Sequence, residues 1–381
     1  MVQHHNLVAP SPAPMLQPHS TPFHRHRSTV VRVAPELTTM TLRYLTTLAA
    51  TLVVGASAIV VPAPSSAQLP RVGIIDFYGL RKTTAAQVRE ALGINVGDSL
   101  TAAAMFEVPA RLADLPGVVS AAIDPVCCED GKTMLYVGVA EEGSPTLELH
   151  ARPTGTIRLP AEVVQAGIAF AQAHNRAVMR GFVKEDISQG HSLMADSAAR
   201  MIQLRFVDLA AKYADSLRAV LRTSDDPDHR ALAAEVLAYS ANKQSVVADL
   251  VYAMRDPASD VRNNATRALA LIAGYGQRNP AARITVPHEP FIDLLNSLAW
   301  TDRNKASLAL MQLTEGRDRA LLTALKARAF DSIVDIARWT NPGHSMAGVM
   351  MLGRMAGITD ADTYAMFERG EREKIIEAAR K

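Results

Sequence analysis

Four segments in the C-terminal half repeat one pattern: HRALAAEVLAYSA at 229–241, VRNNATRALALIA at 261–273, DRNKASLALMQLT at 302–314 and GHSMAGVMMLGRM at 343–355. When aligned, they share an alanine and, four positions later, a larger apolar residue: Ala233 and Leu237, Ala265 and Leu269, Ala306 and Leu310, Ala347 and Met351. A small residue lets a neighbouring helix approach closely, and the larger residue one turn later fills the core between helix layers. The pattern predicts stacked helices over 223–381.

Proline turns separate these helices, as in Asp256-Pro257 and Asn341-Pro342. The segment DPASDVRNNATRALALIA resembles a HEAT repeat, a family in which an Asp-Pro turn, an Asp-Val-Arg start and a small-residue inner helix recur. The Pro-rich insert 277–290 is expected to be a surface loop that lengthens one repeat. The resemblance implies an all-α HEAT-like solenoid whose concave face binds protein.

Two further segments precede the repeats. Residues 161–179 and 192–213 carry apolar residues at helical spacing and predict a helical cap or bundle over 161–222. Residues 143–160 are rich in Pro and Gly and are expected to be a linker.

The region 70–142 shows alternating strand and helix patterns. In order, we expect a strand at 72–77, a helix at 84–92, a helix at 102–115, and strands at 118–126 and 133–140 joined by a hairpin turn at 129–132. The fold class is therefore a small α+β domain of order β-α-α-β-β, followed by the HEAT-like solenoid.

This region resembles a polypeptide-transport-associated (POTRA) domain. The features that match are a strand ending in Gly79, a helix started by Thr84, a turn at Gly97, the run from Leu112 to Val118, and a last strand ending in Val139 and Glu141. The resemblance implies a module that handles proteins outside the cytoplasm and binds extended chains at a sheet edge.

The N-terminal segment has the layout of an export signal. Residues 1–39 are rich in His and Pro and are expected to be a disordered leader. Residues 40–67 then carry Arg43, an apolar stretch and Ser65-Ser66-Ala67, which predicts a signal peptide cut before Gln68. An uncleaved N-terminal anchor is the alternative, and it is the one expected route to membrane contact. Either way, we expect a periplasmic or secreted protein.

Charge argues against nucleic acid as a partner. The whole chain has a formal net charge of +2. Residues 1–67 contribute +3, which leaves −1 for the remainder. A near-neutral chain without a basic run has no long-range field that attracts phosphates.

The two cysteines are adjacent, at Cys127 and Cys128. Neighbouring cysteines close almost no chain, so a disulfide between them would add little stability. Two interpretations stay open: a vicinal disulfide that acts as a rigid or redox-sensitive turn, and two separate thiols at the end of a strand. No His or second cysteine pair lies at zinc-ligand spacing, so no metal or cofactor is expected.

Three other motifs suggest chemistry. Gly343-His344-Ser345 resembles a nucleophile elbow, and Gly190-His191-Ser192 is a poorer match, but Ala347 stands where the elbow needs glycine and a helical pattern precedes it. The methionines Met346, Met350, Met351 and Met355 are spaced for one helix, as a core stripe or as a Cu(I) or partner surface. We therefore expect no catalytic residues.

Together these patterns predict an extracytoplasmic scaffold with protein partners in the cell envelope. The strand at 118–126 is expected at the sheet edge, where it would bind an extended segment; its candidate contact residues are Val118, Val119, Ser120, Ala121, Ala122 and Ile123. The alternatives are an envelope-localised, hydrolase-like enzyme that uses the helices before 222, and a redox or metal sensor that uses Cys127-Cys128 or the methionines.

Overall fold

A three-stranded sheet with two helices forms the first part of the described chain. The computed structural model describes residues 70–381. In chain order the elements are β1 (Val72–Tyr78), α2 (Ala85–Leu92), α3 (Ala104–Ala113), β2 (Val118–Glu129) and β3 (Lys132–Glu141). β3 lies in the middle of the sheet, parallel to β1 and antiparallel to β2. This order leaves β2 at an edge.

Local signals explain where these elements begin and turn. Thr84 caps α2, because its hydroxyl accepts from Gln87 N at 3.3 Å while Gln87 Oε1 accepts from Thr84 N at 2.9 Å. The β2–β3 hairpin turns at Asp130 and Gly131, which have φ angles of 48° and 72°. Two consecutive positive φ angles are what a tight hairpin requires, and Asp-Gly is among the pairs that adopt them most readily.

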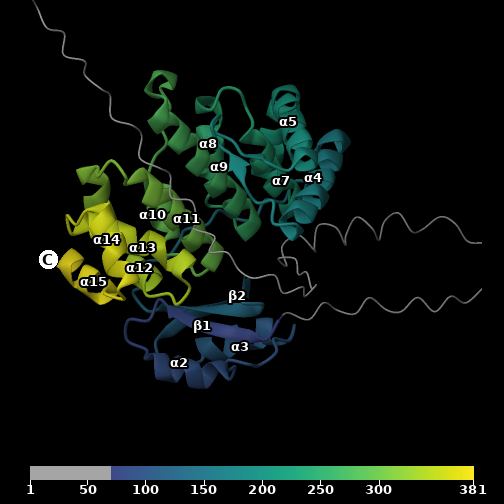
Figure 1. Cartoon of the computed structure of the whole chain (residues 1–381). Helices are drawn as coiled ribbons and strands as arrows, with labels where there is room; N and C mark the ends of the chain where they lie inside the picture. The colour runs from purple at the N-terminus through teal and green to yellow at the C-terminus, as the bar shows by residue number, and fades with distance from the viewer. Residues whose placement is uncertain (1–69) are drawn as a thin grey trace, which may run out of the picture. The chain divides into compact units, whose positions relative to one another are not determined.

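Both faces of the sheet are covered. On one face, Leu135 of β3 packs with Val88 of α2 and Leu112 of α3. On the other face, Met134 and Tyr136 join the core of the helical part. Figure 1 shows the sheet between α2 and α3 on one side and α12 and α13 on the other. Successive residues of a strand point to opposite faces, so β3 can supply both cores.

The helical part consists of successive helix pairs. The pairs are α6 (Ala214–Thr223) with α7 (Pro227–Leu237), α8 (Gln244–Ala253) with α9 (Ser259–Arg278), α10 (Glu289–Leu294) with α11 (Trp300–Leu313), and α12 (Arg319–Ala337) with α13 (Pro342–Met355). The second helices pack in a row, α7 on α9, α9 on α11 and α11 on α13. These second helices carry the four repeated segments.

Flanking helices extend this row at both ends. α4 (Ala161–Met179) and α5 (Ser197–Lys212) pack together and contact α7. α14 (Asp360–Glu368) and α15 (Arg372–Arg380) pack on α13. Among residues 70–381, no helix is both long and apolar enough to span a membrane.

The predicted repeat register agrees with the burial of its residues. The aligned alanines and the larger residues one turn later are at most 1% exposed: Ala233, Ala265, Ala306, Ala347, Leu237, Leu269, Leu310 and Met351. The helices stack closely through the small side chains, as the alignment predicts.

Buried arginines bind the turns between these helices. Arg230, Arg262 and Arg303 each lie three residues before the aligned alanine, and each donates to the carbonyl six residues earlier, at 2.6–2.8 Å. Arg230 also forms a bidentate ion pair with Asp256 of the next repeat, at 2.7 and 2.8 Å. Arg262 pairs with Asp302 at 2.8 Å. In the fourth repeat His344 takes the place of the arginine.

One predicted boundary was wrong. The helix expected from Ser192 begins at Ser197, because Asp196 caps it by accepting from Ala199 N at 3.0 Å. Just before it, Leu193–Met194 (β5) pairs with Glu185–Asp186 (β4). The insert expected as a surface loop over 277–290 connects α9, which ends at Arg278, to α10, which begins at Glu289, and most of its residues are exposed. Val286 in the insert packs into the core.

The predicted linker lies along the helical part. His150 N donates to Arg255 O at 2.7 Å, and Gly155 N donates to Thr223 O at 2.8 Å. Leu159 is buried in the helical core. The segment 143–160 is therefore held by the repeats along its length.

Candidate functional site

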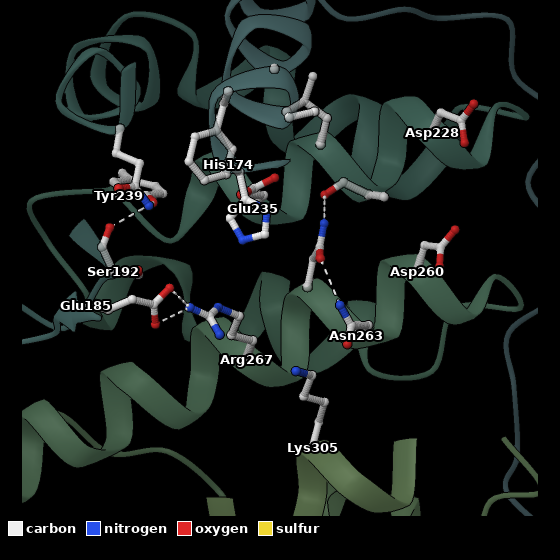
Figure 2. Close-up of a pocket in the computed structure, with 17 residues that line it drawn as sticks. His174, Glu185, Ser192, Asp228, Glu235, Tyr239, Asp260, Asn263, Arg267 and Lys305 are labelled. Atoms are coloured by element: carbon white, nitrogen blue, oxygen red, sulfur yellow. Dashed lines mark hydrogen bonds and ion pairs between the residues drawn. The ribbon is translucent and has the colours of Figure 1, made fainter. Parts of the chain in front are cut away.

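A pocket of about 320 Å³ lies on the row of second helices, beside α4 and α5. One part of its wall is apolar and comes from α4 and α7: Gly167, Phe170, Ala171, Ala231 and Leu232. The rest is polar, with side chains from β4, α5, α7, α9 and α11 (Figure 2). Pockets of this size and composition are typical of sites for small ligands or single side chains.

An ion pair crosses one side of this pocket. Arg267 of α9 donates through Nη2 to both carboxylate oxygens of Glu185, with 2.6 Å to Oε2 (Figure 2). Both side chains keep some exposure, so the pair remains in contact with the pocket. Arg267 is largely neutralised by this partner.

Two other acidic groups of the pocket, Glu235 and Asp260, have raised pKa values. Burial raises the pKa of Glu235 to about 7, although Arg267 acts in the opposite direction. Burial also raises the pKa of Asp260, and the charge of Asp228 adds to the effect. Burial lowers the pKa of His174, and Arg267 lowers it further. The imidazole is therefore neutral at pH 7.

A buried serine lies on the wall beside these groups. Ser192 is 6% exposed and its carbonyl oxygen accepts from Tyr239 Oη at 2.9 Å. Gln203 Nε2 in turn donates to Tyr239 Oη at 3.0 Å and fixes the tyrosine. Within the described residues, Ser192 Oγ has no hydrogen-bond partner. No base activates this hydroxyl there, so the Gly190-His191-Ser192 motif lacks the nucleophile–base contact of a hydrolase.

The predicted docking strand is present at the sheet edge. Val119 is 63% exposed, whereas Ile123 is buried under α2 and α3. The remaining four candidate residues, Val118, Ser120, Ala121 and Ala122, are half-buried. Of the strands described, β3 alone pairs with β2.

Proline indicates which backbone groups of β2 face outward. Pro125 lies opposite Leu135 inside the paired region, and proline in a strand is tolerated where its nitrogen faces away from the neighbour. Backbone direction alternates along a strand, so Ala121 and Ile123 also direct their NH groups away from β3. Ala122 and Asp124 direct theirs toward β3.

The remaining sequence motifs have structural positions. Ser345 is buried inside α13, and Asn341 caps that helix by accepting from His344 N at 3.0 Å, so the Gly343-His344-Ser345 segment is a helix start. Met350 and Met351 are buried, and Met346 and Met355 pack against the same core. Within residues 70–381 no group of three or more His, Cys, Asp or Glu side chains is arranged to hold a metal ion.

The adjacent cysteines lie at the end of β2. Cys127 is opposite Thr133, and the register shifts between Cys127 and Glu129. A bulge at Cys128 therefore interrupts the regular pairing, which resumes with Glu129 opposite Lys132. The vicinal disulfide stays a prediction.

An aromatic contact that the sequence did not predict joins the sheet to the helices. Tyr136 stacks on Trp300 with ring centroids 5.1 Å apart and meets Trp339 edge-on at 5.0 Å. The hydroxyl of Tyr136 is 2.6 Å from His344 Nδ1. The fourth repeat thus uses its histidine to bind the sheet.

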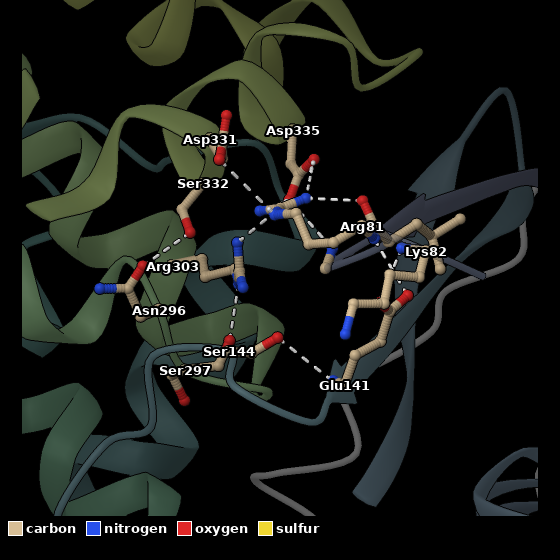
Figure 3. Close-up of polar contacts among 12 residues, drawn as sticks. Arg81, Lys82, Glu141, Ser144, Asn296, Ser297, Arg303, Asp331, Ser332 and Asp335 are labelled. Carbon is tan, nitrogen blue, oxygen red and sulfur yellow. Dashed lines mark hydrogen bonds and ion pairs between the residues drawn. The ribbon is translucent and has the colours of Figure 1, made fainter. Parts of the chain in front are cut away.

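Polar contacts surround this aromatic cluster. Arg81 pairs with Asp335 of α12 at 3.0 Å, and Gly79 N donates to the same carboxylate at 2.9 Å (Figure 3). Glu141 accepts from the backbone NH groups of residues 81–83 at 2.7–3.0 Å. Burial alone would raise the pKa of Glu141, but these three donors outweigh it and the pKa is lowered. The sheet is held to α12 by specific contacts.

Comparison with known families identifies part of the helical region. Residues 214–286 match the family model of HEAT repeats. The match runs from α6 through α9 and starts inside the segment expected as a cap. This part of the chain is a helical-repeat region, and HEAT repeats generally mediate protein–protein interaction. No curated protein matches the sequence.

Proposed function

We propose that the protein is an extracytoplasmic scaffold whose POTRA-like module binds an extended protein segment at β2, while the helical repeats bind a second protein surface. The observation that carries the proposal is the edge position of β2, where Ala121 and Ile123 direct NH groups outward. An extended chain can pair with such an edge through its backbone. The HEAT repeats support a role in protein binding.

Proline substitution tests the docking strand. Ala121→Pro removes an outward donor and leaves the β3 ladder intact, whereas the control Ala121→Ser keeps the donor. The assay is a pull-down from a cell-envelope fraction, with the bound proteins quantified by mass spectrometry. We expect Ala121→Pro to lose proteins that the unmodified chain captures, and Ala121→Ser to retain them. Equal melting temperatures of both variants verify the fold. Recovery of the same partners by Ala121→Pro would show that β2 is not the docking strand.

The extracytoplasmic location rests on residues 40–67, which lie outside the described residues. We expect N-terminal sequencing of the exported protein to find Gln68 as the first residue. An intact Met1 or Met40 on the exported protein would contradict cleavage at this site.

The pocket favours a second candidate function. Side chains of α4 and α5 line the pocket, among them His174 of α4, together with Glu235 of α7. These two helices belong to the region before residue 222, in which the alternative hydrolase-like enzyme would have its site. Convergent polar groups with shifted pKa values are typical of ligand-binding and catalytic sites. Since, among the described residues, Ser192 Oγ makes no hydrogen bond to a base, ligand binding is the better-supported role.

A further inference from the structure

The pocket beside α4 carries an excess of negative charge. Four carboxylates line it, from Glu185, Asp228, Glu235 and Asp260, together with two cationic side chains, Arg267 and Lys305. Arg267 Nη2 binds both carboxylate oxygens of Glu185, so these two charges cancel one another. The remaining titratable groups of the wall are Asp228, Glu235, Asp260 and Lys305, together with His174, which is neutral at pH 7. The local field favours a cation.

Glu235 is the acidic group that most needs a counter-charge. It lies on α7, where it is half-buried and lines the pocket. The other titratable groups that line the pocket come from several elements: His174 on α4, Glu185 on β4, Asp228 on α7, Asp260 and Arg267 on α9, and Lys305 on α11 (Figure 2). Arg267 is the cation that acts on Glu235, and it is already bound to Glu185.

Ser192 Oγ is a second, independent observation that points to a ligand. A buried hydroxyl without a partner costs free energy, and such groups are rare in folded proteins. Ser192 lines the same pocket as Glu235, and within the described residues its buried hydroxyl has no hydrogen-bond partner. A ligand that donates hydrogen bonds would satisfy both groups.

The apolar part of the pocket wall restricts the size and chemistry of the ligand. Phe170 and Leu232 can contact an alkyl stem, and a volume of about 320 Å³ is at the lower end for small-molecule sites. An ammonium group offers three donors that can reach acceptors on separate elements, which suits the scattered positions of Glu235 and Ser192.

We infer that the pocket binds a primary alkylammonium group, with Glu235 as its carboxylate partner, Ser192 Oγ as a further acceptor and Phe170 against the alkyl stem. The group is supplied by a free amine or by a lysine side chain of a protein. When it binds, the proton on a neutral Glu235 leaves for solvent and a carboxylate–ammonium pair forms. This inference goes beyond the scaffold role and does not depend on docking at β2.

Calorimetric titration of the full chain at pH 7 tests the inference. The probes are 1,5-diaminopentane, a Gly-Lys-Gly peptide with blocked ends, and 1-pentanol as the uncharged control. We expect one or both amines to bind, with proton release that shows as a dependence on the ionisation enthalpy of the buffer. Binding of the diamine alone identifies a free amine as the source, and binding of the peptide identifies a lysine side chain.

Variants assign the binding to this pocket. We expect Glu235→Gln to weaken amine binding about tenfold or more and to abolish the proton release. Ser192→Ala should weaken binding severalfold. Glu148→Gln, at an exposed carboxylate outside the pocket, should bind as the unmodified protein does. Absence of heat with both amines, equal binding of 1-pentanol, or unchanged binding by Glu235→Gln in a folded protein would each overturn the inference.

Discussion

The buried ion pair between Arg230 and Asp256 should be the most sensitive polar contact of the repeats. Both side chains are 2% exposed, and the guanidinium makes two bonds to the carboxylate and one to Ser224 O. Asp256→Asn keeps the shape and the bond from Ala258 N but leaves the guanidinium buried without a counter-charge. Removing one partner of such a pair typically costs about 3–5 kcal/mol.

This free energy can be converted to a melting temperature. An unfolding entropy of about 2.1 cal/mol/K per residue, over roughly 300 residues, gives about 0.6 kcal/mol for each kelvin. A loss of about 3 kcal/mol therefore lowers the melting temperature by about 5 °C. Circular dichroism follows the helices, and fluorescence of Trp300 and Trp339 follows the sheet contact, so coincident transitions would verify that one event is measured.

A double-mutant cycle and a surface control complete the design. We expect Arg230→Met with Asp256→Asn to be destabilised by less than the sum of the two single changes, because neither charge is then left alone in the core. The surface control is Glu373→Gln, which breaks the ion pair with Arg338. The side chains of Arg338 and Glu373 are 50% and 56% exposed, so we expect the free energy of unfolding to fall by less than about 1 kcal/mol. If Asp256→Asn melts no lower than Glu373→Gln, the buried pair does not stabilise the array.

Three further changes test other parts of the structure. Ala265→Leu should destabilise the protein by about 1–3 kcal/mol in thermal melts, because Ala265 is fully buried between helices; an unchanged melt would count against the register. Glu235 has its pKa raised to about 7 from the ordinary 4.5, so the unfolded chain ionises first and stability falls as pH rises between these values. Glu235→Gln should therefore be more stable than the unmodified protein above pH 7, by up to about 3 kcal/mol, and equal to it below about pH 4.5; denaturant titrations that show no such divergence would refute the raised pKa. Tyr136→Phe removes the contact with His344 Nδ1 and should cost about 0.5–1.5 kcal/mol in denaturant titrations, whereas an unchanged midpoint would mean that the contact adds nothing.

Features set by local sequence could be predicted. The aligned alanines and their apolar partners lie inside helices, where spacing along the chain fixes which side chains share a face. Thr84 as a cap and Asp130-Gly131 as a turn likewise depend on neighbours within a few residues. The pairing of β2 with β3 followed from the hairpin, because the two strands are adjacent in the chain, whereas the edge position of β2 also depends on the long-range pairing of β1 with β3.

Features set by distant partners could not be predicted. Tyr136 and His344 are 208 positions apart in the sequence. Asp76, whose carboxylate accepts from Thr340 N, is 264 positions from Thr340. Glu235 looks like a solvent-facing residue in its repeat, and the pocket around it exists because α4, which does not share the repeat pattern, lies beside α7. The contacts and pKa values of such residues depend on which elements pack against each other in the folded protein. The spacing of residues along the chain does not carry this information.

The contact between Tyr136 and His344 has a consequence for biosynthesis. A chain is made from its N-terminus at about 5–20 residues per second, so the strand that carries Tyr136 exists for roughly 10–40 s before the histidine that receives it. During that interval the aromatic face of β1 and β3 has no cover from α11, α12 or α13, and a chaperone or an early binding partner could occupy it. Release of such an occupant would then be timed by completion of the last repeat.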